Sequence, residues 1–426
     1  MARFDAFRSL PSSQPSSLCA FAPLRETLPV GPVVVGYFSM TRKNYLPFGK
    51  PNFSQEEVEA VTAVIRSGWV GMGPETIAFE RELADYLGVP HVICVNSCTS
   101  ALFLSLLVAG VGKGDEVVCP SLTWCSTANA ALYLGARAVF CDVDAGSLCM
   151  TTESILEKVT RKTRAVVVVH FGGLGVDVRK LRAALPRRIA IIEDAAHAFG
   201  SGYPDGRKVG SSGNATCFSF YANKNLSTGE GGAIALFNSR HADRIRSLRQ
   251  HALPIDAWKR FTHPKAILLS NHLTELGYKM NYTDLQACIG RVQLRRYGGL
   301  AKRRLQIAKR YVTLLGDMEP PLKFQSEITA ARHARHLFTV QLGKRGGSLG
   351  RDEMLAALKA KNIGATLHYT PLHLMPLYGR KRCHLPVTET VSRSMLTLPI
   401  SSSMTLDDAE YVSGHFRDIL QRRQSF

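Results

Sequence analysis

The sequence predicts an α/β fold, with a mostly parallel central sheet flanked by helices and a smaller α+β domain at the C-terminus. Short apolar runs alternate with helical stretches along most of the chain, which is the pattern of a parallel sheet. The chain has 426 residues, 45% of them hydrophobic. This length corresponds to roughly two domains with a large core.

Six short apolar segments are expected to form the strands: His91–Val95, Glu116–Cys119, Ala136–Cys141, Ala165–His170, Ile189–Ile192 and Ala215–Tyr221. Ser54–Ile65 opens with a serine and has a glutamate three residues later, which predicts a capping box and a helix. A long helix is expected from Thr283 through Arg296 and the basic stretch beyond. We therefore expect an extension over 1–44, a large domain over 45–283 and a small domain over 284–426.

The first candidate site residue is Lys224. It lies in CFSFYANKNLSTGEGG, Cys217–Gly232, where an apolar strand runs into a glycine-rich loop. One interpretation is a solvated loop cation, because lysines are rarely buried. The other is an amine at the end of a buried strand, where desolvation lowers its pKa and suits it to form a Schiff base.

Acidic residues end another apolar strand about thirty residues upstream, in IAIIEDAAHAF, Ile189–Phe199. The ends of such strands are where α/β sheets bind ligands. Asp194 is either a helix cap or solvated carboxylate, or a partner for a ring nitrogen that keeps a pyridinium protonated. His197 either lies above a ring or fills space.

Small hydroxyl residues in VNSCTSAL, Val95–Leu102, stand between a strand and an apolar helical stretch. The amides and the dipole of a helix N-terminus attract phosphate groups, although Ser and Thr are also ordinary caps. Trp124, in PSLTWCSTANAAL, offers a flat face after another strand. A place in the core is the other interpretation of this tryptophan.

Taken in chain order, these motifs resemble the site of fold-type I pyridoxal phosphate enzymes, and more narrowly the DegT/StrS-type nucleotide-sugar aminotransferases. FSFYANKNLSTGEGG, EDAAHA and NSCTSAL match the family's elements, and the resemblance covers the chain from Tyr45 onwards. It implies that Lys224 forms the Schiff base with pyridoxal 5'-phosphate and that Asp194 pairs with the pyridine nitrogen. The other implied cofactor contacts are Cys98, Thr99 and Ser219 at the phosphate, Trp124 stacked on the ring and His197 near its hydroxyl.

The sequence departs from the family pattern in three segments. Cys98 replaces the usual glycine, which leaves the N–H donor but takes more room. Lys279 stands where an asparagine of the partner subunit commonly reaches the phosphate, so the resemblance implies a homodimer with shared active sites. Gly71 and Met72 remove hydroxyl contacts from the WVGMGP segment, so the sugar stays open.

The resemblance implies transfer of an amino group from glutamate or glutamine to the keto sugar of a nucleotide-sugar, for polysaccharide or lipopolysaccharide biosynthesis. The GYxxxxTDLQA form favours C4 of the sugar over C3. His368 and Tyr369 are candidate substrate contacts or strand-end packing residues. A dehydratase of the same fold, in which histidine replaces the lysine, is disfavoured by Lys224; a regulatory binder without turnover is the third hypothesis.

A net charge of +19 could mark a nucleic-acid surface, with Arg295–Arg304 and Arg345–Arg351 as its clusters. A nucleotide diphosphate also needs cations, and charge runs are usually solvated faces, so we expect no nucleic-acid partner. The ten cysteines show no CxxC pair and no zinc spacing, so neither a metal site nor disulfides are expected. Reduced, buried thiols favour the cytoplasm.

The first 40 residues lie outside the resemblance. They are rich in Ser, Pro and Arg, with Asp5 and Glu26 as their acidic residues, which is typical of a transit peptide. Alternatively the start is assigned upstream of the true one at Met40, which is the interpretation we favour. Leu28–Phe38 is too short and too interrupted to span a membrane, so no membrane partner is expected.

Overall fold

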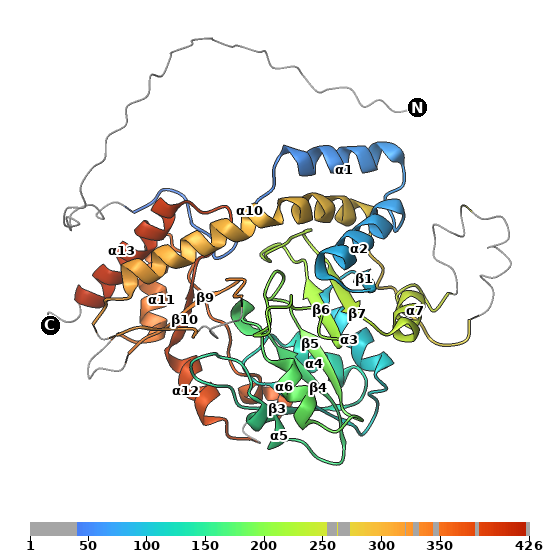
Figure 1. The fold of residues 1–426 in the computed structure, drawn as a ribbon. Coiled ribbons are helices and arrows are strands. Elements are labelled where there is room, and N and C mark those ends of the chain that lie inside the picture. The colour runs from blue at the N-terminus through green and yellow to red at the C-terminus, as the bar shows by residue number, and fades with distance from the viewer. Residues whose placement is uncertain are drawn as a thin grey trace, which may run out of the picture. The chain divides into compact units, whose positions relative to one another are not determined.

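The computed structural model describes residues 41–253, 262, 273–319, 321–326, 332–343, 349–379 and 383–422, and a seven-stranded sheet lies at its centre (Figure 1). The strand order is β1-β7-β6-β5-β4-β2-β3. The strands are β1 His91–Val95, β2 Glu116–Pro120, β3 Arg137–Cys141, β4 Thr163–Val169, β5 Ala190–Asp194, β6 Ala215–Ser219 and β7 Gly232–Leu236. β2 to β6 pair in parallel, and β7 runs antiparallel to both β1 and β6. The predicted fold class, an α/β fold with a mostly parallel sheet, is confirmed.

The six expected strands all form, with ends that differ from the expected ones by at most two residues. One correction concerns β5, which ends at Asp194, so that Glu193 and Asp194 are its last two residues. β7 is absent from the expected strands because its five residues directly follow the glycine-rich loop. Hydrogen bonding to two neighbouring strands makes this short run a strand.

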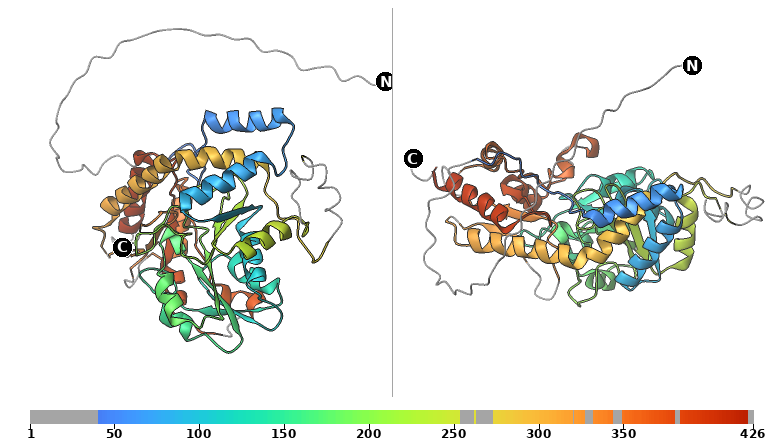
Figure 2. Two further views of the ribbon diagram at one scale, coloured as in Figure 1. Left: turned by 45° about the vertical axis from the view of Figure 1, so that its right-hand side comes forward. Right: turned by 90° about the horizontal axis from the view of Figure 1, so that it is seen from above.

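Helices cover both faces of the sheet (Figures 1 and 2). One face packs against α2 (Pro74–Leu87), α5 (Thr152–Leu156), α6 (Val178–Ala184) and the first part of α10 (Asp284–Leu315). The other packs against α3 (Cys98–Val108), α4 (Ser126–Leu132) and α7 (Ser239–Leu248). In β4, Val166 and Val168 enter the first core, whereas Ala165 and Val167 enter the second. Burial on both faces explains why the strands read as continuous apolar runs.

A smaller antiparallel sheet of order β10-β9-β8 lies near the end of α10 that contacts α13 (Figure 1). Its strands are β8 Lys323–Phe324, β9 Phe338–Gln341 and β10 Met395–Leu398. The helices of this part are α11 Arg351–Ala360, α12 Pro386–Ser394 and α13 Leu406–Arg422. Short 3₁₀ turns are η1 Phe171–Gly173, which follows β4, and η2 Leu372–Leu374 and η3 Pro376–Tyr378, which precede α12. Figure 2 shows α10, 32 residues long, running from the large sheet to α13. Because Met40–Phe426 form one compact unit, the domain boundary at Thr283 stays a prediction.

The predicted capping box forms at α1 (Gln55–Ser67). The backbone N–H and the hydroxyl of Ser54 each donate to Glu57 at 2.6 Å. The other carboxylate oxygen of Glu57 accepts from Gln293 at 2.6 Å and from Arg296 at 2.5 Å. One carboxylate therefore caps α1 and ties it to α10, along which α1 lies in Figure 1.

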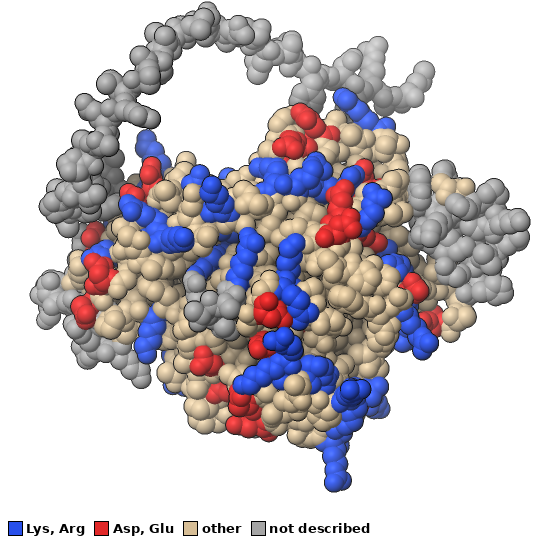
Figure 3. Space-filling view, in the orientation of Figure 1, with Lys and Arg blue, Asp and Glu red and all other residues tan. Residues whose placement is uncertain are grey.

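The basic cluster Arg295–Arg304 is partly structural. Arg296 binds Glu57, and Arg304 is buried and donates to the carbonyl of Ile400 at 3.1 Å. On the face in Figure 3, acidic side chains lie among the basic ones.

Most of the second basic cluster, Arg345–Arg351, lies outside the described residues. The hypotheses on Met40 and Leu28–Phe38 also concern residues outside the described ranges. Within the described ranges, no helix is both long and apolar enough to cross a membrane.

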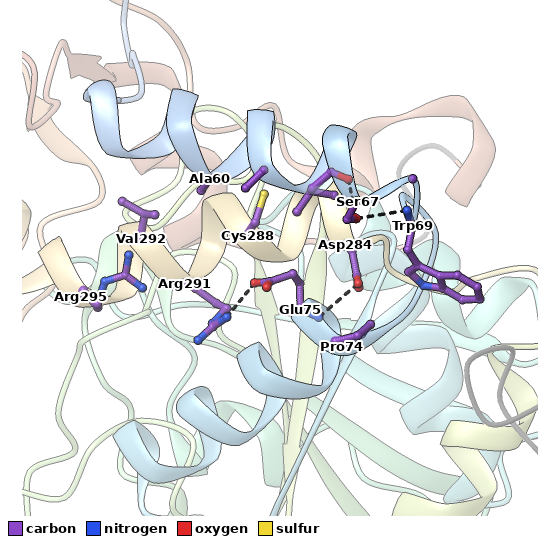
Figure 4. A pocket seen from close by; sticks show the side chains of 13 residues that line it. Ala60, Ser67, Trp69, Pro74, Glu75, Asp284, Cys288, Arg291, Val292 and Arg295 are labelled. Atoms are coloured by element: carbon purple, nitrogen blue, oxygen red, sulfur yellow. Dashed lines mark hydrogen bonds and ion pairs between the residues drawn. The ribbon is translucent and has the colours of Figure 1, made fainter. Parts of the chain in front are cut away.

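The N-terminus of α2 is capped by a side chain from another helix. Its N-cap residue is Gly73, which has no side chain to offer. Asp284, at the start of α10, accepts instead from the backbone N–H groups of Gly73 (2.8 Å), Glu75 (3.1 Å) and Thr76 (2.9 Å) and from the Thr76 hydroxyl (2.7 Å). Figure 4 shows this carboxylate between the two helices. The cap thus fixes the crossing of α2 and α10.

We expect Asp284→Ala to lower the free energy of unfolding by about 3 kcal/mol, because it leaves buried donors without an acceptor. Urea unfolding followed by circular dichroism measures this. Asp243→Ala is the control, since the Asp243 side chain is exposed and pairs with Arg246 on the helix surface, and we expect a change within about 0.5 kcal/mol. Equal losses in the two variants would contradict a special role for the Asp284 cap.

Candidate active site

A cavity of about 400 Å³ lies at the carboxyl ends of the parallel strands. Val169, Asp194 and Ser219, the last residues of β4, β5 and β6, all border it. Nine residues selected from the sequence line this one cavity: Cys98, Thr99, Trp124, Asp194, His197, Ser219, Lys224, His368 and Tyr369. Its volume suits a small ligand or cofactor.

Lys279 does not line this cavity. Its side chain is exposed, and its backbone forms a bridge with Gln250. The neighbouring Met280 carbonyl accepts from Asn96 N–H at 3.0 Å, which places the segment beside the start of α3. A contact of Lys279 with the cofactor of a partner subunit stays a prediction.

The first turn of α3 forms one end of the cavity. Ser97 caps the helix by accepting from Ser100 N–H at 3.1 Å. The N–H groups of Cys98 and Thr99 are in the first turn, where amides have no acceptor within the helix. Thr99 donates its hydroxyl to Ser126 at 2.8 Å. Free donors and the helix dipole suit this end to an anion.

The structure accommodates the cysteine that replaces the family's glycine. The Cys98 sulfur lies 3.7 Å from the carbonyl oxygen of Cys217 and so points to the interior. Burial raises the pKa of the Cys98 thiol well above its usual value, so it stays protonated. The added side chain therefore leaves the amide available to a ligand.

Two hydrogen bonds fix the carboxylate of Asp194 in the lining of the cavity. Asp194 is 6% exposed, and its two oxygens accept from the Thr127 hydroxyl at 2.7 Å and the Ala196 N–H at 3.1 Å. Burial raises the pKa of Asp194, while these two hydrogen bonds and the charge of Lys224 oppose the rise. A buried carboxylate is stabilised by a cation, and a protonated ring nitrogen is such a partner.

Aromatic rings border the cavity on another side. Trp124 is 60% exposed, so its interpretation as a core residue is wrong. Its ring centre lies 5.9 Å from that of Tyr369, whose hydroxyl is 3.0 Å from His197 Nε2. The Gly172 N–H donates to His197 Nδ1 at 3.4 Å, so Nε2 carries the hydrogen. Burial holds the pKa of His197 well below its usual value, so the ring is neutral.

Lys224 is half-buried at the cavity wall. Its Nζ lies 3.4 Å from Nε2 of His336. Burial lowers the pKa of Lys224 to about 8, although the nearby Cys98 and Asp194 act in the opposite direction. About a tenth of the amine is then unprotonated at pH 7, far more than for a solvated lysine.

Two residues of this arrangement are missing from the sequence prediction. Thr127, whose hydroxyl orients Asp194, lies three residues after Trp124. Its position in the same sequence motif as Trp124 could have indicated that it belongs to the site. His336, beside Lys224, lies 112 positions further along the chain, in a segment without a motif. Only the fold brings it to the lysine.

These groups fit pyridoxal phosphate. The α3 amides and Ser219 suit its phosphate, the buried Asp194 suits its ring nitrogen, and the exposed Trp124 face suits its ring. Lys224 has the lowered pKa that a covalent amine link requires. The donor set thus contains a partner for each polar part of the cofactor.

Comparison with known proteins identifies the family of the chain. Residues 51–417 match the model of the DegT/DnrJ/EryC1/StrS aminotransferase family. The chain is 40% identical over 386 residues to the spore coat polysaccharide biosynthesis protein SpsC of Bacillus subtilis (strain 168), covering 89% of this chain and 98% of that protein.

Two solved structures are similar throughout. Aminotransferase TlmJ from Streptoalloteichus hindustanus has a TM-score of 0.80 at 34% identity, covering 88% of this chain and 99% of TlmJ. Spr1654 from Streptococcus pneumoniae, assigned as a sugar aminotransferase and solved in its PLP form, has a TM-score of 0.81 at 28% identity, covering 89% and 99%. The chain therefore belongs to the DegT/DnrJ/EryC1/StrS family, and it is a sugar aminotransferase that depends on pyridoxal phosphate.

Proposed function

We propose that the protein moves an amino group from glutamate or glutamine to the keto sugar of a nucleotide-sugar, at C4, in polysaccharide biosynthesis. The observation that carries the chemistry is Lys224, because its pKa is lowered and it lines the same cavity as Asp194. The name of the relative SpsC supports the pathway class. The C4 position rests on the GYxxxxTDLQA form.

Each residue has a distinct task in this proposal. Bound pyridoxal phosphate supplies the electron sink for the reaction. Lys224 Nζ holds the cofactor and, when free, carries protons to and from the reacting carbon. Asp194 keeps the ring nitrogen protonated, and Thr127 fixes the direction of its carboxylate. The α3 amides bind the phosphate, and Trp124 covers the ring.

Neutral groups at the cavity wall suit a sugar. Burial lowers the pKa of His368 to about 3 and raises that of Tyr369, so both are uncharged at neutral pH. Uncharged donors and acceptors match sugar hydroxyls better than they match phosphate. We therefore propose His368 and Tyr369 as contacts to the sugar.

Nine described cysteines form no disulfide with one another, which supports the proposed cytoplasmic location.

The test is amination of a panel of 3-keto and 4-keto sugar nucleotides, with glutamate or glutamine as donor and mass spectrometry of the products. Wild-type protein should change its cofactor absorbance on addition of the donor and aminate a 4-keto sugar. Lys224→Ala should lose at least about a thousandfold in rate, because it removes both the link and the proton carrier. Failure to aminate any sugar while the cofactor stays bound would overturn the proposal in favour of a regulatory binder.

Asp194→Asn should lower kcat by at least about a hundredfold, because a neutral amide cannot stabilise a protonated ring nitrogen. Stopped-flow absorbance of the donor half-reaction measures this. Thr127→Val is the matched control, since it removes one hydrogen bond but keeps the carboxylate, and we expect a smaller loss. A wild-type rate in the Asp194→Asn variant would remove this carboxylate from the chemistry.

We also propose that the protein acts as a homodimer in which α1 contacts the second copy. Val58 and Ile65 lie seven residues apart on one face of α1 and are exposed. A pocket of about 750 Å³ lies between α1, α2 and α10, on the other face of α1, where Ala60 and Val64 line it (Figure 4). Val58 and Ile65 do not line this pocket, so their side chains face away from α10. Apolar side chains on an exposed helix suit coverage by another chain.

The double variant Val58→Asp, Ile65→Asp should shift the protein towards monomer, because charged side chains are costly at an apolar contact. Light scattering after size exclusion measures the mass, and cofactor content is measured on the same fractions. Val312→Asp, which alters an exposed apolar residue of α10, is the control. A double variant that stays dimeric would place the interface elsewhere.

A further inference from the structure

A chain of three hydrogen bonds runs behind the candidate catalytic lysine. Asn225 Nδ2 donates to the Ala334 carbonyl at 2.9 Å. The Asn225 Oδ1 lies 3.2 Å from His336 Nδ1, and His336 Nε2 lies 3.4 Å from Lys224 Nζ. His336 is 2% exposed, and its backbone N–H donates to the Gly172 carbonyl at 3.0 Å. The imidazole is therefore fixed in place.

This chain determines which ring nitrogen of His336 carries the hydrogen. A backbone carbonyl only accepts, so the amide NH₂ of Asn225 must face Ala334, and its oxygen must face His336. Nδ1 of His336 is then the N–H donor to Asn225. Nε2 keeps its lone pair, and this lone pair points at the amine of Lys224.

His336 stays neutral in its surroundings. Burial holds the pKa of His336 well below its usual value, and the nearby Lys224, His197, Arg304 and His368 lower it further. The ring centres of His336 and His197 are 4.6 Å apart. Since each of these neighbours is cationic or becomes cationic on protonation, His336 acts as an acceptor and not as a second cation.

We propose that His336 is a positioning residue for Lys224. Its Nε2 accepts an N–H of the lysine whenever this amine is not bonded to the cofactor, and so directs the amine into the cavity. The proposal rests on the proposed role of Lys224. It explains how a flexible side chain with four rotatable bonds returns to one geometry between the two halves of a transfer reaction.

Two substitutions separate this role from simple packing. His336→Asn places an amide near the Nδ1 position, so it keeps the contact with Asn225 but loses the acceptor at Lys224. His336→Gln places an amide oxygen near the Nε2 position, so it keeps the acceptor. His333→Asn is the control, because His333 is a half-buried histidine of the same segment whose Nε2 lies 3.1 Å from Gln325 instead of from Lys224.

The main measurement is the pH dependence of acetic anhydride labelling of Lys224 in cofactor-free protein, followed by peptide mass spectrometry. The wild-type midpoint should lie at about 8. An acceptor stabilises the ammonium form, so its loss in His336→Asn should move the midpoint down by about 0.5 to 1 pH unit. His336→Gln and His333→Asn should stay at the wild-type midpoint.

In the cofactor-loaded enzyme, His336→Asn should lower kcat about tenfold, with the donor KM changed less than about twofold, and His336→Gln should recover most of the rate. An unchanged midpoint and an unchanged kcat in His336→Asn would overturn the proposal. Equal shifts in the Asn and Gln variants would also overturn it, because packing alone would then explain both.

Asn225→Asp tests the same chain without altering His336. A carboxylate beside Nδ1–H makes Nε2 more basic, so the Lys224 midpoint should move up instead of down. A downward shift would contradict the proposed direction of the hydrogen bonds. The labelling profile needs no substrate, so a failure of the sugar panel and a failure of this proposal are read separately.

Discussion

The site depends on the contact between the start of β7 and the N-terminus of α3, because this contact joins the loop that carries Lys224 to the first turn of α3. A side chain at Gly232 would place its Cβ 2.5 Å from the carbonyl carbon of Ser97 and 2.6 Å from Cys98 N. Because only glycine permits this approach, β7 can insert between β1 and β6 and pair with both. The loop that carries Lys224 precedes β7 directly, so this contact sets the distance between the lysine and the first turn of α3, the proposed phosphate site.

Burial of charged and polar groups then sets the chemistry. Asp194, His197, His336 and Lys224 lie within one small region, and burial shifts the pKa of each in the direction that favours its neutral form. Such groups cost stability unless hydrogen bonds satisfy them. Thr127 and Ala196 serve Asp194, and Asn225 serves His336. These hydrogen-bond partners thus stabilise Asp194 and His336 in their buried positions and also fix the orientation of the two side chains.

The parts predicted from the sequence are those whose signal is local. Strands buried on both faces read as apolar runs, and the capping box of Ser54 and Glu57 is a spacing of three. The residues around Lys224 and Asp194 carry family motifs, and these line one cavity. His336 and β7 are different, because each gains its role from a partner distant in the chain. The exposure of Trp124 likewise depends on which segments pack above it, which composition alone does not determine.

The smaller sheet contributes directly to the site, so its packing bears on catalysis. His336 lies two residues before β9, and His368 donates or accepts at Thr397 of β10 at 3.0 Å. Arg304 of α10 links these segments by donating to the carbonyls of Arg335 and Ile400. A shift of this sheet against α10 would move His336 and His368 relative to Lys224, which is anchored on the large sheet through β6 and β7. The long helix therefore does more than connect two parts: it fixes the lysine's acceptor and the proposed sugar contacts in one frame with the lysine.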